Sequence, residues 1–197
     1  MADRLRTIIN SLPAHIALLD DEGTIIDVNE RWRHFGREND SSDPLFGVGT
    51  NYLSICDNAT DECAEEAAEM ARGLRDVLAG RQQVFTLEYP CHAPDERRWF
   101  RVMANRLAGK SDDSDTDGIV VMHIDVTERK LAEEELNRLA YEDRLTGLLS
   151  RQGFTRALSR LLGNRGWQRE GIVVMLDVQH LRDVNEAHGY DIGDELL

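Results

Sequence analysis

Residues 118–130 read G-I-V-V-M-H-I-D-V-T-E-R-K and pass from β-branched apolar side chains into a charged, helix-favouring segment. The alternation predicts a strand over Gly118–Val126, with one apolar face formed by Val120, Met122, Ile124 and Val126. His123 alternates with that face, so we expect it to point outward. Thr127 can cap the helix that follows, and the carboxylate of Asp125 can pair with a nearby arginine. The stretch therefore predicts a junction between a sheet and an outgoing helix.

The preceding residues predict the rest of an antiparallel sheet with flanking helices. Apolar runs bounded by turn residues indicate four more strands, at His15–Leu19, Thr24–Val28, Gln83–Tyr89 and Arg97–Leu107. In the last of these, Phe100, Val102 and Ala104 share a face. Helical spacing and capping residues indicate helices over 4–12, from Glu30 to a stop at Gly36 after an N-cap at Asn29, and from about Thr60 to Leu78. The stretch Asn39–Thr50 reads as loop.

This order of elements resembles a PAS domain. Three strings carry the likeness, D-V-N-E-R-W at 27–32, Y-P-C-H-A-P-D-E-R-R-W-F at 89–100 and D-V-T-E-R-K at 125–130. The resemblance covers roughly residues 8–130 and implies an N-terminal helix (1–13) and a PAS sensor domain (14–127). It also implies a small-ligand pocket between sheet and helices, and a signal-transfer junction at Asp125 and Thr127.

The residues narrow the choice of ligand without identifying it. The expected long helix carries no histidine for haem, and Asn51 and Cys56 are not adjacent, as a photoactive flavin module would require. His15 and His34 lie at element edges and are expected to be partly exposed. Cys56, Cys63, Cys91 and His92 lack close zinc-ligand spacing. Asp113–Gly118 begins like a calcium loop, but Ile124 stands where a bidentate Glu is required, which indicates an acidic hairpin.

Residues 128–142 are predicted to form a linker helix, starting at Thr127 and ending near Tyr141. Ala132, Leu136 and Leu139 make a short apolar seam on it. Two interpretations remain open, a seam that aligns two copies in a homodimer and an isolated solvated helix.

The segment after the linker resembles the opening part of a GGDEF domain, the nucleotide-cyclising module of diguanylate cyclases. The likeness rests on D-R-L-T-G-L-L-S-R-Q-G-F at 143–154 and M-L-D-V-Q-H-L-R-D-V-N-E-A-H-G-Y-D-I-G-D at 175–194, within a fragment expected over 143–197. Between them we expect an amphipathic helix over 151–163 and a buried strand over Gly171–Val178. The fold class is therefore α/β (α+β), a PAS-type sheet followed by an incomplete GGDEF domain.

The resemblance implies a role for four residues of this segment. Asp177 and the backbone carbonyl of Val178 would bind Mg²⁺, and Asn185 and Asp194 would read the guanine of GTP. In that family two such domains, each holding one GTP, form cyclic di-GMP together. Departures from the usual pattern occur at Gln179, Leu181, Arg182, Glu186 and Tyr190.

The sequence ends before the glycine-acid loop that supplies the remaining acidic metal ligand, so we expect this chain to form no cyclic di-GMP. We also expect the strand at Gly171–Val178 to lack partners and to be poorly ordered or packed in a non-native way. Three functions remain open. They are a sensor and dimerisation module of a diguanylate cyclase, a sensor joined to a degenerate GGDEF domain that regulates a cyclic di-GMP phosphodiesterase, and a stand-alone ligand-binding module.

Composition limits the partners of the chain. A formal net charge of −14 over 197 residues disfavours nucleic acid and anionic membrane surfaces, because both would be repelled. Three cysteines suggest reduced thiols, and no apolar run approaches the ~20 residues that span a bilayer. We therefore expect a cytoplasmic protein with no membrane contact from this chain.

Overall fold

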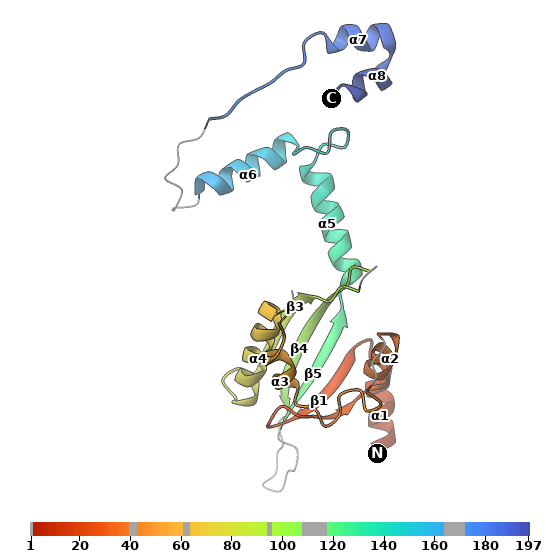
Figure 1. Cartoon of the computed structure of the whole chain (residues 1–197), viewed down its shortest axis with the longest axis vertical. Helices are drawn as coiled ribbons and strands as arrows, with labels where there is room; N and C mark the ends of the chain where they lie inside the picture. Colours follow the sequence, from red (N-terminus) through yellow and green to blue (C-terminus); the bar gives the residue numbers. More distant parts are fainter. Residues whose placement is uncertain (1, 40–42, 61–63, 94–95, 108–117, 164–171) are drawn as a thin grey trace. The chain divides into compact units, whose positions relative to one another are not determined.

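The computed structural model describes residues 2–39, 43–60, 64–93, 96–107, 118–163 and 172–197, and it divides into two compact units. The units are Met1–Glu128 and Arg129–Leu197 (Figure 1). The finer division into 1–13, 14–127, 128–142 and 143–197 stays a prediction. The acidic hairpin expected from Asp113 lies almost wholly outside the described residues.

The N-terminal unit is built on a five-stranded antiparallel sheet with the strand order β2-β1-β5-β4-β3. The strands are β1 (His15–Asp20), β2 (Ile25–Val28), β3 (Val84–Pro90), β4 (Trp99–Leu107) and β5 (Gly118–Asp125). All five predicted strands are therefore confirmed, as is the antiparallel sheet with flanking helices. Because β1 pairs with β5, the first hairpin and the last three strands join into one sheet.

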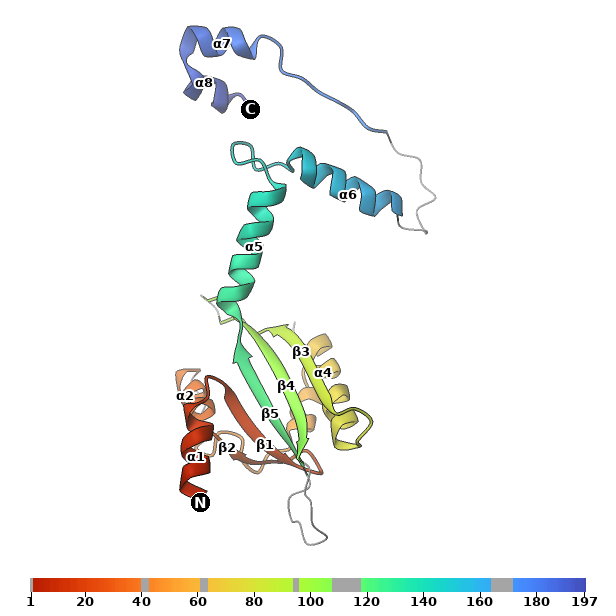
Figure 2. The ribbon, with the colours of Figure 1, turned by 180° about the vertical axis from the view of Figure 1, so that it is seen from behind.

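The helices of this unit are α1 (Ala2–Ser11), α2 (Glu30–Glu38), α3 (Tyr52–Asp57) and α4 (Ala64–Leu78). Helix α4 contacts β3, β4 and β5, and α2 contacts β1. The two helices therefore lie near opposite edges of the sheet (Figures 1 and 2). The predicted stop at Gly36 is wrong, because α2 continues to Glu38 and ends at Asn39. Helix α3 was not predicted, because its 6 residues are too few to show helical periodicity.

The core lies between α4 and one face of the sheet, and the face of β5 that forms it is opposite to the predicted one. Ile119, Val121 and His123 are buried, whereas Val120, Met122 and Ile124 are only partly covered. The expectation that His123 points outward is therefore wrong. Both faces of β5 are apolar enough to be buried, so the strand alone does not decide which one packs inward.

The C-terminal unit contains the predicted linker helix from Arg129 on and the first helix after it. Helix α5 spans Thr127–Tyr141 and α6 spans Arg151–Gly163, as expected. Asp143 fixes the turn between them, because its Oδ1 accepts hydrogen bonds from the amides of Leu145 and Thr146. These contacts hold the pKa of the Asp143 carboxyl below its usual range. Two short helices end the chain, α7 (Leu181–His188) and α8 (Tyr190–Glu195).

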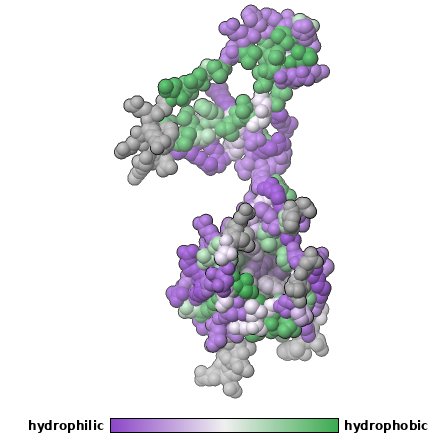
Figure 3. All heavy atoms as spheres, in the orientation of Figure 1, coloured by the Kyte–Doolittle hydropathy of each residue, from purple (hydrophilic) through white to green (hydrophobic). Residues whose placement is uncertain are grey.

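The strand predicted at Gly171–Val178 is not formed over the described part of that segment. Residues 172–178 have no strand assignment, and side chains such as Ile172 and Met175 are 91% and 93% exposed. Figure 3 shows this segment as a largely hydrophobic stretch that continues from the grey residues. Separately, no helix among the described residues is long and apolar enough to cross a bilayer.

Candidate functional site

A buried histidine held between two tyrosines lies in the core of the N-terminal unit. His123, on β5, is 5% exposed. Its Nδ1 is 2.6 Å from the hydroxyl of Tyr89 on β3, and its Nε2 is 3.3 Å from the hydroxyl of Tyr52 on α3. Three elements that are far apart in the sequence therefore meet at one imidazole ring.

Aromatic rings surround this histidine and line a small cavity of about 60 Å³. The Trp32 ring packs edge-on against His123 at 5.6 Å, and the Phe35 ring packs edge-on against Phe100 at the same centroid distance. The other lining residues are His15, Tyr89 and Cys91. As expected, His15 is partly covered and His34 is exposed.

The site is uncharged. Burial, with a smaller effect from His15, lowers the pKa of His123 to about 3, so its ring is neutral at physiological pH. Burial also raises the pKa of the Tyr52 phenol, so this hydroxyl keeps its proton. The pKa of His15 is lowered as well, first by burial and then by Arg31. A neutral imidazole offers one donor and one acceptor, and both of its nitrogens here face a hydroxyl.

A second cavity of about 190 Å³ adjoins the first, because Tyr89 and Cys91 line both. Its other lining residues are Tyr52, Cys56, Glu66, Ala67, Met70 and Pro90. Burial raises the pKa of the Cys56 thiol to about 11 and also raises that of Cys91, so both thiols stay protonated. Within the described residues, no group of three or more His, Cys, Asp or Glu could hold a metal ion.

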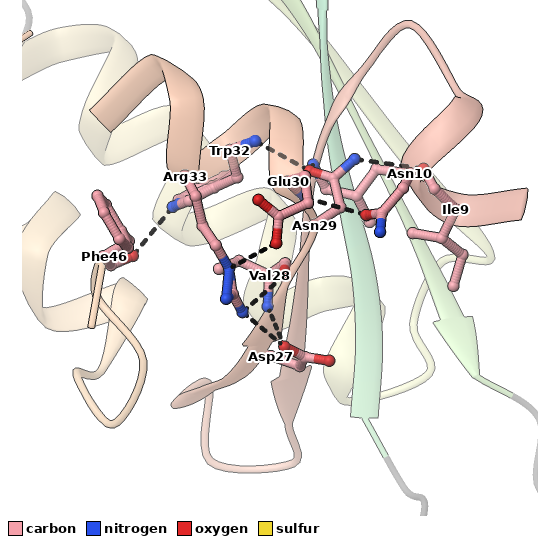
Figure 4. Close-up of polar contacts among 10 residues, drawn as sticks. Ile9, Asn10, Asp27, Val28, Asn29, Glu30, Trp32, Arg33 and Phe46 are labelled. Carbon is pink, nitrogen blue, oxygen red and sulfur yellow. Dashed lines mark hydrogen bonds and ion pairs between the residues drawn. The ribbon is translucent and has the colours of Figure 1, made fainter. Parts of the chain in front are cut away.

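The first turn of α2 joins the cavity wall to the N-terminal helix. Asn29 is 5% exposed, and its Oδ1 accepts hydrogen bonds from the amides of Trp32 and Ile16, each at 3.0 Å. Its Nδ2 donates to the carbonyls of Ala14 at 2.9 Å and of Ile9, on α1, at 3.4 Å. Figure 4 shows the contacts of Asn29 with Trp32 and with Ile9. The predicted N-cap is therefore confirmed, but the same side chain also ties α1 to the sheet.

Neighbouring contacts support the same turn. The indole N–H of Trp32 donates to the carbonyl of Phe46 at 3.0 Å, which holds its ring in the cavity wall. The Glu30 amide donates to Oδ1 of Asn10, also at 3.0 Å, and Arg33 pairs with Asp27 at 3.2 Å (Figure 4). A displacement of Trp32 would therefore change the hydrogen bonds that attach the end of α1 to this turn.

Asp125 and Thr127, which were expected at the signal-transfer junction, connect the sheet to α5. Their contacts differ from the predicted ones. The Asp125 carboxylate accepts a hydrogen bond from the Thr127 amide at 2.8 Å, whereas we expected an arginine partner. The Thr127 hydroxyl oxygen accepts one from the Trp99 amide at 3.0 Å and therefore anchors the start of β4. The Val126 amide donates to the Trp99 carbonyl at 2.9 Å. The start of α5 is thus bonded to the strand next to β5.

The four residues implied in nucleotide binding lie in two places of the C-terminal unit. Asp177 and Val178 belong to the exposed segment 172–178. Asn185 lies on α7, and its Oδ1 contacts Gly193 on α8, directly before Asp194. A Cβ at position 193 would overlap with that oxygen. The two helices therefore bring Asn185 next to the residue that precedes Asp194.

By themselves these four residues would supply only part of a nucleotide site. A carboxylate and a carbonyl are oxygen donors of the kind that Mg²⁺ prefers, but an octahedral ion needs more ligands than two. The Oδ1 atom of Asn185 is buried and has no hydrogen-bond donor among the described residues, so this acceptor is not turned toward a ligand. The described residues therefore do not by themselves form a complete metal or base-binding centre.

Comparison with known proteins agrees with both parts of the chain. Residues 9–131 match the family profile described as the PAS fold. The chain belongs to the PAS family. Residues 140–197 match the profile of the diguanylate cyclase GGDEF domain, so the PAS domain is followed by part of a GGDEF domain. The cavity around His123 thus lies between the sheet and helices of the PAS domain.

Curated relatives have names from both sides of cyclic di-GMP metabolism. An uncharacterised 104.1 kDa protein of Rhodobacter capsulatus is 41% identical over 127 residues, which is 62% of this chain and 13% of that protein. The cyclic di-GMP phosphodiesterase PdeR of Escherichia coli is 36% identical over 73 residues (37% and 11%). The diguanylate cyclase DgcM of the same species is 29% identical over 80 residues (40% and 19%). The chain therefore spans less than a fifth of each of these relatives.

Proposed function

We propose that this chain is the sensory and dimerisation part of a signalling protein that controls the level of cyclic di-GMP through a GGDEF output domain. The observation that carries the proposal is the order of the two family matches, a PAS domain over 9–131 followed by a GGDEF match over 140–197. The GGDEF match implies GTP as substrate and Mg²⁺ as cofactor in general. Relatives named as a cyclase and as a phosphodiesterase support cyclic di-GMP as the second messenger.

The contacts inside the PAS domain supply a route from the cavity to the output helix. His123 lies on β5 two residues before Asp125, and Asp125 bonds to the first residue of α5. The cavity wall and the start of α5 therefore share one strand. A ligand that moves this end of β5 would change the packing at Thr127, and the change would pass along α5.

Dimerisation is part of this proposal, because two GGDEF domains, each with one GTP, form cyclic di-GMP together. Two copies of the protein must therefore lie side by side. Helix α1 exposes Leu5 and Ile8, and α5 exposes Leu136 and Leu139. Pairing these residues with a second copy would bury apolar surface that is otherwise in water. The seam on α5 would then fix the rotation of the two output domains.

The roles proposed for the C-terminal residues follow the family pattern. Asp177 and the carbonyl of Val178 would bind Mg²⁺, and Asn185 and Asp194 would bind the guanine. The carboxylate of Asp194 can accept two N–H donors, and an amide can donate and accept at once. In the relevant state the Asn185 amide would have to turn away from Gly193.

The test uses the full-length protein that contains this chain. One residue inserted after Glu134 rotates everything that follows in α5 by about 100° without changing the PAS core. We expect the rate of cyclic di-GMP formation or breakdown to change at least severalfold, whereas Asn137→Gln, at an exposed position of the same helix, should leave it unchanged. Equal rates for the insertion variant and the wild type would contradict control through α5.

A second function is favoured by the departures in the GGDEF pattern, among them Gln179 and Tyr190. In this alternative the GGDEF domain binds GTP without cyclising it and regulates a cyclic di-GMP phosphodiesterase. Purified full-length protein separates the two. Conversion of GTP into cyclic di-GMP supports the first function, and GTP-dependent hydrolysis of cyclic di-GMP supports the second.

A further inference from the structure

His123, Tyr52 and Tyr89 meet at the centre of the PAS core. Together they carry one more donor proton than the two hydrogen bonds between them require. The neutral His123 ring carries one N–H, and Tyr52 and Tyr89 each carry an O–H, so three protons are available. Only two contacts join the three groups, one at each ring nitrogen. One hydroxyl therefore keeps a proton that does not point at the histidine.

The distances indicate which hydroxyl this is. Hydrogen bonds from O–H groups are typically about 2.7–2.8 Å long, and those from N–H groups about 2.9–3.0 Å. The 2.6 Å contact between Tyr89 and Nδ1 thus fits a hydroxyl that donates to the ring. The 3.3 Å contact at Nε2 fits a ring N–H that donates to the oxygen of Tyr52. The proton of the Tyr52 hydroxyl is then directed away from His123.

Tyr52 also lines the larger cavity of about 190 Å³. An apolar cavity on the order of 150 Å³ is sufficient to bind benzene. The larger cavity can therefore hold a single ring, whereas the adjoining space of about 60 Å³ is too small for one. Among the residues that the structure describes, the Tyr52 hydroxyl contacts no acceptor besides the ring of His123. An unpaired polar group is costly in a largely apolar cavity, so a ligand that brings an acceptor is favoured there.

The remaining walls argue against a charged ligand. Ala67, Met70 and Pro90 are apolar, and the Cys56 thiol is protonated. The described residues that line the two cavities include no lysine or arginine, so none of them would neutralise an anion. Glu66 is the carboxylate among the described lining residues, and it would repel an anion further.

We propose that the larger cavity binds a small, uncharged ring compound whose single hydrogen-bond acceptor is held by the hydroxyl of Tyr52. The proposal rests on the sensor role proposed above and names the chemical class of what is sensed. The aromatic residues of the adjoining cavity would respond to the ligand through Tyr89, which lines both spaces. The ligand would thereby reach His123 and the end of β5.

The test measures binding of three probes to the chain by calorimetry. Acetophenone has a ring and a carbonyl acceptor, ethylbenzene replaces that carbonyl by CH₂, and benzoate carries a charge. We expect acetophenone to bind most tightly. In a Tyr52→Phe variant its Kd should rise about five- to tenfold, to that of ethylbenzene, because one hydrogen bond is lost, and the Kd of ethylbenzene should not change.

A second measurement keeps the proposal testable if the variant does not fold. In the ¹⁵N-labelled wild-type chain, the imidazole resonances of His123 should show the proton on Nε2. A proton on Nδ1 would overturn the assignment, because Tyr52 would then donate to the ring. Tighter binding of benzoate or ethylbenzene, or no binding of any probe, would also overturn the proposal. None of these measurements involves nucleotide turnover, so a failure of the proposed function in cyclic di-GMP control would be seen separately.

Discussion

Replacing Asn29 by alanine should destabilise the PAS domain far more than the loss of an ordinary N-cap. The side chain is 5% exposed and makes three hydrogen bonds of 3.0 Å or less, to the amides of Trp32 and Ile16 and to the carbonyl of Ala14. Each such bond contributes about 1 kcal/mol net. We therefore expect the free energy of unfolding to fall by about 3 kcal/mol, a large part of the 5–15 kcal/mol typical of a domain.

Asn51 provides the matched control. It is also an N-cap asparagine, at the start of α3, but it is only half-buried and makes two hydrogen bonds, accepting from Ser54 and donating to the carbonyl of Glu22. Asn51→Ala should cost about 1–2 kcal/mol. Urea unfolding of the whole chain, followed by the fluorescence of Trp32 and Trp99, measures both, in a background where Trp167 is replaced by Phe. If Asn29→Ala costs no more than Asn51→Ala, then Asn29 does not tie the elements together as argued.

Three further predictions concern single positions of the PAS domain. The folded pKa of His123, about 3, lies below its unfolded value of 6.5, so the folded state binds fewer protons between these values. The free energy of unfolding should therefore fall as the pH drops from 6.5, by up to about 1.4 kcal/mol per unit, and His123→Phe should show a shallower slope in urea titrations. Thr127→Val should lower the free energy of unfolding by about 1 kcal/mol and speed hydrogen exchange of the Trp99 amide, whereas Thr127→Ser should do neither. Gly73→Ala would raise helix propensity, but its Cβ would overlap with the Phe85 ring, so we expect the free energy of unfolding to fall by about 1–3 kcal/mol, and a higher unfolding temperature would contradict this.

Much of the fold could be predicted because its signals are local. Apolar runs between turn residues mark the strands of the PAS domain, with clear alternation in β4 and β5, and capping residues such as Asn29 mark the start of a helix. The prediction failed where position depends on a distant element. The orientation of His123 is such a case, since both faces of β5 are apolar. The pairing of His123 with Val102, whose face was assigned correctly, places the histidine inward, because directly paired residues share a face.

The candidate site depends even more on distant contacts. Tyr52, Tyr89 and His123 come from α3, β3 and β5, and nothing in their local sequence links them. The junction was found from its string, but the partner of Thr127 is an amide on β4, which sequence does not reveal. In the C-terminal unit, the apolar run Gly171–Val178 predicted a strand that residues 172–178 do not form, because an apolar run forms a strand only with a neighbour to pair with.

The first turn of α2 connects the cavity with the N-terminal helix α1, and this connection affects how ligand affinities can be measured. Trp32 forms part of the cavity wall, and Asn29, at the start of the same turn, bonds to the carbonyl of Ile9 at the end of α1. If a ligand alters the attachment of α1, then whatever alters α1 must alter the affinity for the ligand by the same factor. A purification tag or a truncation at the N-terminus that changes the attachment of α1 would then change the affinity of the cavity as well, so a dissociation constant should be compared only between chains that begin in the same way.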